Sequence, residues 1–197
     1  MLEMDTLIVM AMHEEGRDVF DEEMVLYTGV GKINAAYHLT KVLQKLRPER
    51  VINLGSAGST EFSTGQLVNC TEFVQRDMNA TALGIPHFQT PFDVHNSPVL
   101  SYGSRIPLLP KATCGTGDSF YTGGVNDAFN VVDMEAYVFA RICQLEDIPF
   151  TCIKYITDGA NHEAANDWGR TLTSSAVSLR EAYELAITEP VMLMNTG

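Results

Sequence analysis

The 197-residue chain lacks several features that mark other classes of protein. No apolar run approaches the roughly 18 residues that a membrane-spanning helix needs, so we expect none. The four cysteines form no CxxC pair and the five histidines no HxH or HxxxH pair, so no metal site is indicated. Positive charge is scarce, because 13 Lys and Arg stand against 25 Asp and Glu, a net charge of −12. An acidic surface repels phosphate backbones and anionic lipids, which disfavours nucleic acid and membranes as partners.

What is present is typical of one globular domain over residues 1–197. An apolar content of 45% and a charged content of 19% are ordinary for such a domain, and no repeat or linker divides the chain. The first residues, MLEMDTLIVMAMHEE, carry acidic rather than basic charge, so we expect no signal peptide. All four cysteines lie in or beside apolar runs. We expect buried free thiols and a cytoplasmic protein, on the evidence of Cys70, Cys114, Cys143 and Cys152.

Short apolar runs that alternate with helical patterns predict an α/β fold. Strands are expected at Thr6–Met10, Met24–Tyr27, Val51–Leu54, Gln66–Asn69, Glu72–Gln75, Lys111–Thr116 and Phe150–Ile156, and Val131-Val132 is a short apolar run. Helices are expected over Ile33–Leu46, from Ala136 to a stop at 147–149, and over Trp168–Ile187 after an N-cap at 166–167. In the second helix the apolar stripe is expected to be Val138, Ile142 and Leu145, with Phe139 and Cys143 beside it. The segment Arg76–Phe92 is expected to be a long surface loop.

Acidic residues follow several of these strands, at the edge where α/β sheets bind ligands. Glu15 follows the first strand, Asp158 ends the last, and Glu135 lies in a first helical turn. Two interpretations stay open: the carboxylates face one pocket, or they cap helices and begin turns. Likewise, Gly55–Ser59 either lets a ligand approach the backbone or is a plain loop. The pair Phe120-Tyr121 either stacks on a purine or packs in the core.

In this order along the chain, the motifs resemble those of the nucleoside phosphorylase and nucleosidase superfamily. The motifs that carry the likeness are Ala11-Met12-His13-Glu14-Glu15, Gly55-Ser56-Ala57-Gly58, Gly117-Asp118-Ser119-Phe120, Asp133-Met134-Glu135-Ala136 and Thr157-Asp158. The sequence is most similar to the 5'-methylthioadenosine/S-adenosylhomocysteine nucleosidases, although His13 replaces a glutamate of their first motif. The resemblance covers Thr6 to about Ile187. It implies a three-layer α/β/α fold with a central mixed, twisted sheet.

The resemblance also implies roles in cleaving a purine N-glycosidic bond. Asp158 protonates the purine, Glu15 activates water with help from Ser56, and Glu135 binds the ribose hydroxyls. Lys154 stands where the nucleosidases have an arginine that holds the water. The further substrate contacts implied are Met12, Ala57, Gly58, Phe120, Tyr121, Asp133, Met134 and Trp168, with Ala80 and Leu83 lining the 5' pocket of a partner subunit.

Three classes of function remain open. A nucleosidase of methionine salvage is favoured by Glu15 and by the lack of an arginine within Val51–Ser59, where phosphorylases often place one. A purine nucleoside phosphorylase is the first alternative, and Arg76 leaves a nucleotide substrate open. A non-enzymatic nucleoside-binding module is the second, although it has no need of three carboxylates. The resemblance implies no cofactor and a homodimer or larger assembly through Arg76–Phe92.

Overall fold

A computed structural model describes residues 2–93, 97–124, 126–160 and 164–188, with side chains from Met4 onward and not for 164–174. Within these ranges one mixed sheet has eight strands: β1 (Leu2–Met10), β2 (Val25–Tyr27), β3 (Leu46–Gly58), β4 (Leu67–Gln75), β5 (Val99–Ser101), β6 (Lys111–Thr116), β7 (Val131–Asp133) and β8 (Phe150–Asp158). The helices are α1 (His13–Gly16), α2 (Lys32–Leu43), α3 (Ala136–Leu145) and α4 (Ala164–Thr188), with 3-10 turns η1 (Arg17–Phe20) and η2 (Thr81–Leu83).

Part of the sheet closes on itself. β1 lies between β2 and β3 and runs parallel to both. β3 pairs with β8 in parallel and with β7 in antiparallel orientation. β6 joins β7 to β4 in parallel, and β4 pairs antiparallel with both β8 and β5. The strands β3, β7, β6, β4 and β8 therefore form a ring, with β1, β2 and β5 outside it. The predicted central mixed sheet is confirmed, and its closure is an addition to the prediction.

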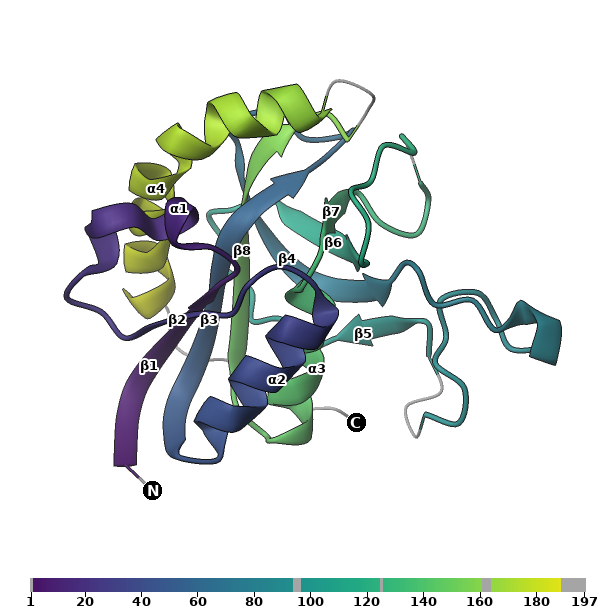
Figure 1. Cartoon of the computed structure of the whole chain (residues 1–197), viewed down its shortest axis with the longest axis horizontal. Coiled ribbons are helices and arrows are strands. Elements are labelled where there is room, and N and C mark those ends of the chain that lie inside the picture. Colours follow the sequence, from purple (N-terminus) through teal and green to yellow (C-terminus); the bar gives the residue numbers. More distant parts are fainter. Residues whose placement is uncertain (1, 94–96, 125, 161–163, 189–197) are drawn as a thin grey trace.

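Helices cover the sheet on two sides (Figure 1). On one side α2 and α3 pack through residues such as Leu39 and Phe139. On the other side α4 and η1 pack through Leu179, Tyr183 and Phe20. The arrangement confirms the predicted α/β/α layers. All nine residues of β8 are buried, which agrees with the strand predicted there, and all four cysteines are buried and free, as expected.

The predicted boundary between the first long helix and the next strand is wrong. α2 ends at Leu43, and Leu46 already pairs with Leu2 in β1. β3 then continues through Gly55–Gly58, which the sequence left as loop or ligand-facing backbone, because this segment pairs with β8. Ladder hydrogen bonds to a neighbouring strand outweigh the weak strand propensity of glycine and serine.

Two other boundaries also differ from the prediction. The two strands expected at Gln66–Asn69 and Glu72–Gln75 are one strand, β4, with a bulge between Cys70 and Glu72 in its pairing with β6. The predicted N-cap at 166–167 lies inside α4, which begins at Ala164. A bulge interrupts the alternation of apolar residues, so a single strand reads as two in the sequence.

The buried face of α3 differs from the predicted stripe. Phe139 and Cys143 are fully buried, with Ala136 and Ala140 beside them. Leu145 is 63% exposed. Because the predicted stripe and the observed buried face are adjacent on the helix, apolar spacing alone does not decide which of them faces the core.

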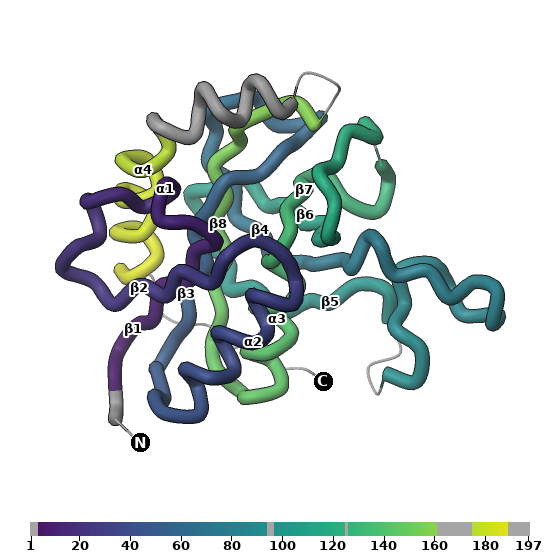
Figure 2. The backbone as a smooth tube through the Cα atoms, in the orientation of Figure 1, coloured from purple at the N-terminus to yellow at the C-terminus, as the bar shows by residue number. Residues whose placement is uncertain are grey.

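The segment Arg76–Phe92 leaves the body of the molecule as an extended arm with η2 near its tip (Figures 1 and 2). Leu83 is 73% exposed and Phe92 is 96% exposed. The predicted long loop is confirmed, apart from the short turn η2. Among the described helices, none combines the length and the apolar character needed to cross a membrane.

Candidate active site

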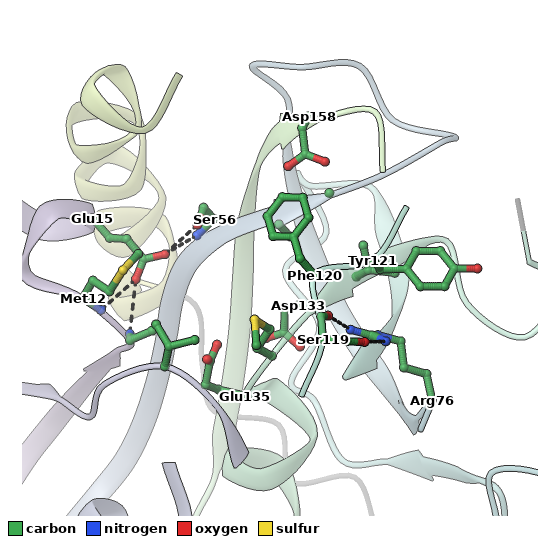
Figure 3. Close-up of a pocket in the computed structure, with 16 residues that line it drawn as sticks. Met12, Glu15, Ser56, Arg76, Ser119, Phe120, Tyr121, Asp133, Glu135 and Asp158 are labelled. Atoms are coloured by element: carbon green, nitrogen blue, oxygen red, sulfur yellow. Dashed lines mark hydrogen bonds between the residues drawn. The ribbon is translucent and has the colours of Figure 1, made fainter. Parts of the chain in front are cut away.

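A cavity lies where β1, β3 and β8 end, and it collects most of the predicted site residues (Figure 3). Segments that follow β6 and β7 complete its wall. The predicted residues that line it are Met12, Glu15, Ser56, Ala57, Gly58, Phe120, Tyr121, Asp133, Met134, Glu135 and Asp158. The structure therefore brings these carboxylates to one cavity, while Glu135 also stands at the N-cap of α3.

Glu15 is held at one side of the cavity by four hydrogen bonds. Its Oε1 accepts the Ser56 amide at 2.7 Å and the Ser56 hydroxyl at 2.8 Å. Its Oε2 accepts the amides of Ala11 and Met12, both at 3.2 Å. The short helix α1 places Glu15 three residues after Met12, so its side chain folds back onto the end of β1. Four donors fill the four lone-pair positions of the carboxylate and fix its orientation.

The glycines of β3 make room for two carboxylates. A Cβ at Gly55 would lie 3.1 Å from Oε1 of Glu15, and a Cβ at Gly58 would lie 2.6 Å from Oδ1 of Asp158. The second distance is shorter than any ordinary contact. One strand segment, with Ser56 between the two glycines, therefore seats both acids.

Asp158 is buried at the end of β8. Its Oδ2 accepts the hydroxyl of Thr157 at 2.9 Å, and its Oδ1 accepts the amide of Ala160 at 2.9 Å. Asp158 and Glu15 lie on different sides of the cavity (Figure 3). Two acids on separate walls can act on two different bonds of one ligand.

Glu135 lies at the start of α3 and reaches across to the start of α2. Its Oε1 accepts the Gly31 amide at 2.7 Å. Burial and the nearby charge of Asp133 raise the pKa of Glu135 to about 8, although the Lys154 ammonium and the Gly31 amide act in the opposite direction. A carboxyl with this pKa gains a proton readily and loses it when a positive charge approaches.

Lys154 is not among the cavity-lining residues, which corrects the expectation that it holds water directly. Its ammonium is buried and lies 2.8 Å from Oδ2 of Asp133. Burial opposes both charges, but their attraction lowers the pKa of Asp133 and raises that of Lys154. Asp133 also accepts the Thr116 hydroxyl at 2.5 Å and the Ala136 amide at 2.8 Å. Through these contacts, Asp133 and Lys154 connect β6, β7, β8 and α3 directly beside Met134 and Glu135.

Phe120 and Tyr121 lie in the segment that follows β6. The Phe120 ring lines the cavity and is 48% exposed, so it is available to a ligand rather than packed in the core. The Tyr121 ring packs edge-on against Phe129 at 5.6 Å between ring centroids. The position of Phe120 therefore fits stacking on a ligand, whereas the Tyr121 ring packs against the core.

Two further predicted residues do not line the cavity, and the side chain of a third is not described. Ala80 and Leu83 are on the arm and do not line the cavity of their own chain. The side chain of Trp168 lies outside the described residues.

Sequence reasoning missed five residues of the wall, which are Ala11, Val30, Arg76, Ser119 and Val132. Three of them, Ala11, Ser119 and Val132, lie within or directly beside a quoted motif, so motif position was a usable signal. Arg76 was considered as a hint of a nucleotide substrate. It lies 41–43 residues before its contacts, Gly117 and Ser119, and only the fold brings them together.

The cavity favours positive charge and proton transfer. Glu15, Asp133, Glu135 and Asp158 contribute four carboxyl groups, while Arg76 is the one cationic residue among its described lining. Preorganised acids of this kind stabilise a positively charged transition state and can donate or accept protons at several points. Among the described residues, no group of three or more His, Cys, Asp and Glu side chains is arranged to hold a metal.

Comparisons with known proteins agree with this arrangement. The family model described as "Phosphorylase superfamily" matches residues 16–184. A 5'-methylthioadenosine/S-adenosylhomocysteine nucleosidase from Bacillus cereus (strain B4264) is 32% identical, over 79% of this chain and 76% of that protein.

Two solved structures share the fold. One is the 5'-methylthioadenosine/S-adenosylhomocysteine nucleosidase from Neisseria meningitidis in complex with methylthio-immucillin-A, with a TM-score of 0.81, 20% identity, and coverage of 94% of this chain and 99% of that chain. The other is the futalosine hydrolase of Helicobacter pylori strain 26695, with a TM-score of 0.83, 18% identity, and coverage of 95% and 98%.

Proposed function

Because the chain belongs to the phosphorylase superfamily, and within it to the 5'-methylthioadenosine/S-adenosylhomocysteine nucleosidases, we propose that its cavity carboxylates hydrolyse the N-glycosidic bond of such a purine nucleoside. The observation that carries the proposal is the presence of Glu15, Glu135 and Asp158 around one cavity. Hydrolysis of this bond needs a base for water, an acid for the leaving purine and a counter-charge for the sugar. The three carboxyl groups supply one each.

Glu15 takes a proton from water as the water oxygen attacks C1' of the ribose. Three of the four donors to Glu15 are main-chain amides and stay in place. The fourth is the Ser56 hydroxyl, which can rotate to contact the water and free a lone pair on Oε1. Ser56 thus positions both the base and its substrate water.

Asp158 gives a proton to a ring nitrogen of the purine as the bond from C1' to the base breaks. The bonding electrons leave with the base, which would otherwise depart as an anion. The Thr157 hydroxyl and the Ala160 amide hold the Asp158 carboxyl in one orientation. Phe120, at the same cavity, is suited to stack on the purine ring.

Glu135 binds the ribose hydroxyls and balances the charge that develops on the sugar. Its pKa of about 8 keeps it protonated in the empty cavity at neutral pH. This proton passes to solvent when the nucleoside binds, and the ionised carboxylate then attracts the cationic sugar of the transition state more strongly than the neutral ground state. Lys154 contributes through Asp133, because that ion pair holds the chain on which Met134 and Glu135 lie.

Water is a better nucleophile for this cavity than phosphate. A phosphate dianion needs cationic partners, and Arg76 is the one such residue in the described lining. Its guanidinium already donates to the Gly117 carbonyl and the Ser119 hydroxyl at 3.1 and 3.0 Å. The same contacts make Arg76 a poor receptor for a nucleotide phosphate.

The assembly and setting of the enzyme are part of the same proposal. The exposed arm that carries Ala80 and Leu83 crosses to a partner subunit in a homodimer and completes the partner's 5' pocket. The chain works as one domain, in the cytoplasm, where four free buried thiols persist. Its place there is methionine salvage, which begins from methylthioadenosine.

The test is release of the purine from 5'-methylthioadenosine, S-adenosylhomocysteine, adenosine, inosine and futalosine, each with and without phosphate. Release in phosphate-free buffer is expected, fastest for a 5'-thio nucleoside. Release that requires phosphate would make the enzyme a phosphorylase. No release from any of them would contradict the proposed activity.

A further inference from the structure

Phe120, the residue suited to stack on a purine, lies in a segment without regular secondary structure. Residues 117–121 follow β6 and belong to no helix or strand. The Phe120 ring is about half exposed, so core packing does not fix its position. The hydrogen bonds of its own backbone segment must do so instead, because a loop without such bonds samples many conformations.

Arg76, which directly follows β4, binds this segment (Figure 3). Its Nη2 donates to the carbonyl of Gly117 at 3.1 Å and also to the carbonyl of Ser119. Its Nη1 donates to the Ser119 hydroxyl at 3.0 Å. The guanidinium also lies over the Tyr121 ring, 5.1 Å from its centroid. One planar fork therefore contacts the residues on both sides of Phe120, which a flexible lysine cannot reproduce.

The close approach of Arg76 also explains a glycine in this segment. A Cβ at Gly117 would lie 3.0 Å from both Cζ and Nη1 of Arg76. The guanidinium thus packs directly against the backbone of the segment. A side chain at this position would push the fork away.

Asp77, the next residue of the chain, binds the same segment at Asp118. Its Oδ2 accepts the Asp118 amide at 3.0 Å, and its Oδ1 accepts the Lys32 ammonium at 2.7 Å. Asp118 in turn accepts the Lys32 amide at 2.7 Å. The preceding amide, that of Gly31, donates to Glu135. Two consecutive amides at the start of α2 therefore hold the Phe120 segment and the ribose-binding acid.

We propose that Arg76 and Asp77 are positioning residues that fasten the segment 117–121 and so hold Phe120 ready for the purine base. This inference rests on the proposed function only in naming a purine as the ligand. Neither residue touches the reacting atoms. Their loss should therefore weaken binding of the base and raise KM, with a smaller effect on kcat.

The first experiment measures amide hydrogen exchange over 117–121 and adenine affinity by calorimetry, in Arg76→Met, Arg76→Lys and Asp77→Asn. Loss of hydrogen bonds to charged groups should speed exchange of this segment about tenfold and weaken adenine binding about tenfold in each variant. KM for 5'-methylthioadenosine should rise with the adenine dissociation constant. Arg76→Lys should resemble Arg76→Met, since the fork and not the charge is needed.

Arg180→Met is the matched control. Like Arg76, Arg180 donates hydrogen bonds and lies over an aromatic ring, 5.3 Å from the centroid of Tyr183, but it bonds to Glu23 and Glu184 and does not line the cavity. It should leave exchange over 117–121 and adenine affinity as in the wild type. Thermal unfolding of every variant checks that the fold is intact.

Unchanged exchange over 117–121 in the Arg76 and Asp77 variants would overturn the proposal. Faster exchange with unchanged adenine affinity would also overturn it, because the segment would then not hold the base. The wild type could bind adenine and the variants could show the predicted changes, while no purine is released from any nucleoside. That result would support the positioning role and contradict the proposed hydrolysis.

Discussion

The Ser56 hydroxyl donates to Oε1 of Glu15 at 2.8 Å, beside the Ser56 amide at 2.7 Å. Of the four donors to this carboxylate it is the only one on a rotatable side chain. The amides of Ser56, Ala11 and Met12 keep Glu15 in place, while the hydroxyl can turn to a water molecule. The backbone thus fixes the base, and one side chain can couple it to the nucleophile.

Glu15→Gln should remove the base while keeping one oxygen to accept part of its hydrogen bonds. The amide retains one acceptor oxygen but cannot take a proton from water, so kcat should fall by about 10² to 10⁴. Adenine affinity, measured by calorimetry, should be retained because Glu15 acts on water and not on the purine. Glu14→Gln is the control, since Glu14 is exposed on the same short helix. A Glu15→Gln variant with the turnover of the wild type would show that another group activates water.

Asp158→Asn should remove the acid while leaving most of its hydrogen bonds. The amide oxygen can still accept the Ala160 amide, but no proton is available to the purine, so kcat should fall by about 10² to 10⁴. A p-nitrophenyl riboside, whose leaving group needs no proton, should lose far less. Equal losses on both substrates would remove Asp158 from the acid role. Asp127→Asn, on an exposed loop, controls for loss of a carboxylate.

Lys154→Met should destabilise the fold by leaving the Asp133 charge buried without its cation. The expected loss in the free energy of unfolding is about 3–5 kcal/mol, measured by urea denaturation. The double variant Lys154→Met/Asp133→Asn should recover much of that loss, because Asn retains an acceptor for Thr116 and Ala136. A single variant as stable as the double would mean that the ion pair contributes nothing to the fold.

Glu135 should make stability depend on pH. In the unfolded chain a glutamate titrates near about 4.3, whereas in the folded protein its pKa is about 8. Between these two pKa values the folded state binds a proton on Glu135 that the unfolded state does not bind. The stability that this proton contributes is complete below the lower pKa and is lost as pH rises through the upper pKa. The loss approaches about 1.4 kcal/mol per pH unit. Denaturation of wild type and Glu135→Gln from pH 4 to 9 isolates this effect, and identical profiles would contradict it.

The strands and acids at strand ends were predictable because local patterns encode them. The apolar runs Thr6–Met10 and Phe150–Ile156 are strands in the structure, and the polar residues after them line one cavity. The strand conformation of Gly55–Gly58 was harder to predict, because it comes from pairing with β8, about a hundred residues away. Small residues carry little strand propensity of their own.

Long-range polar pairs were not predictable. Lys154 was expected to face the water, but Asp133, 21 residues earlier, captures its ammonium in the core. Arg76 was read as part of a surface loop, yet its partners lie after β6. Spacing along the chain reports which face of an element a residue occupies, whereas such pairs depend on which elements become neighbours.

The identity of the sugar product tests the account most directly. The enzyme would be incubated with 5'-methylthioadenosine in buffer that contains phosphate, and the sugar product and the phosphate consumed would be measured together. We predict free methylthioribose in equal amount to adenine, with no phosphate consumed, because the described cavity lining has no uncommitted cation for phosphate. Formation of the sugar 1-phosphate with matching loss of phosphate would contradict water as the nucleophile and return Glu15 to a structural role.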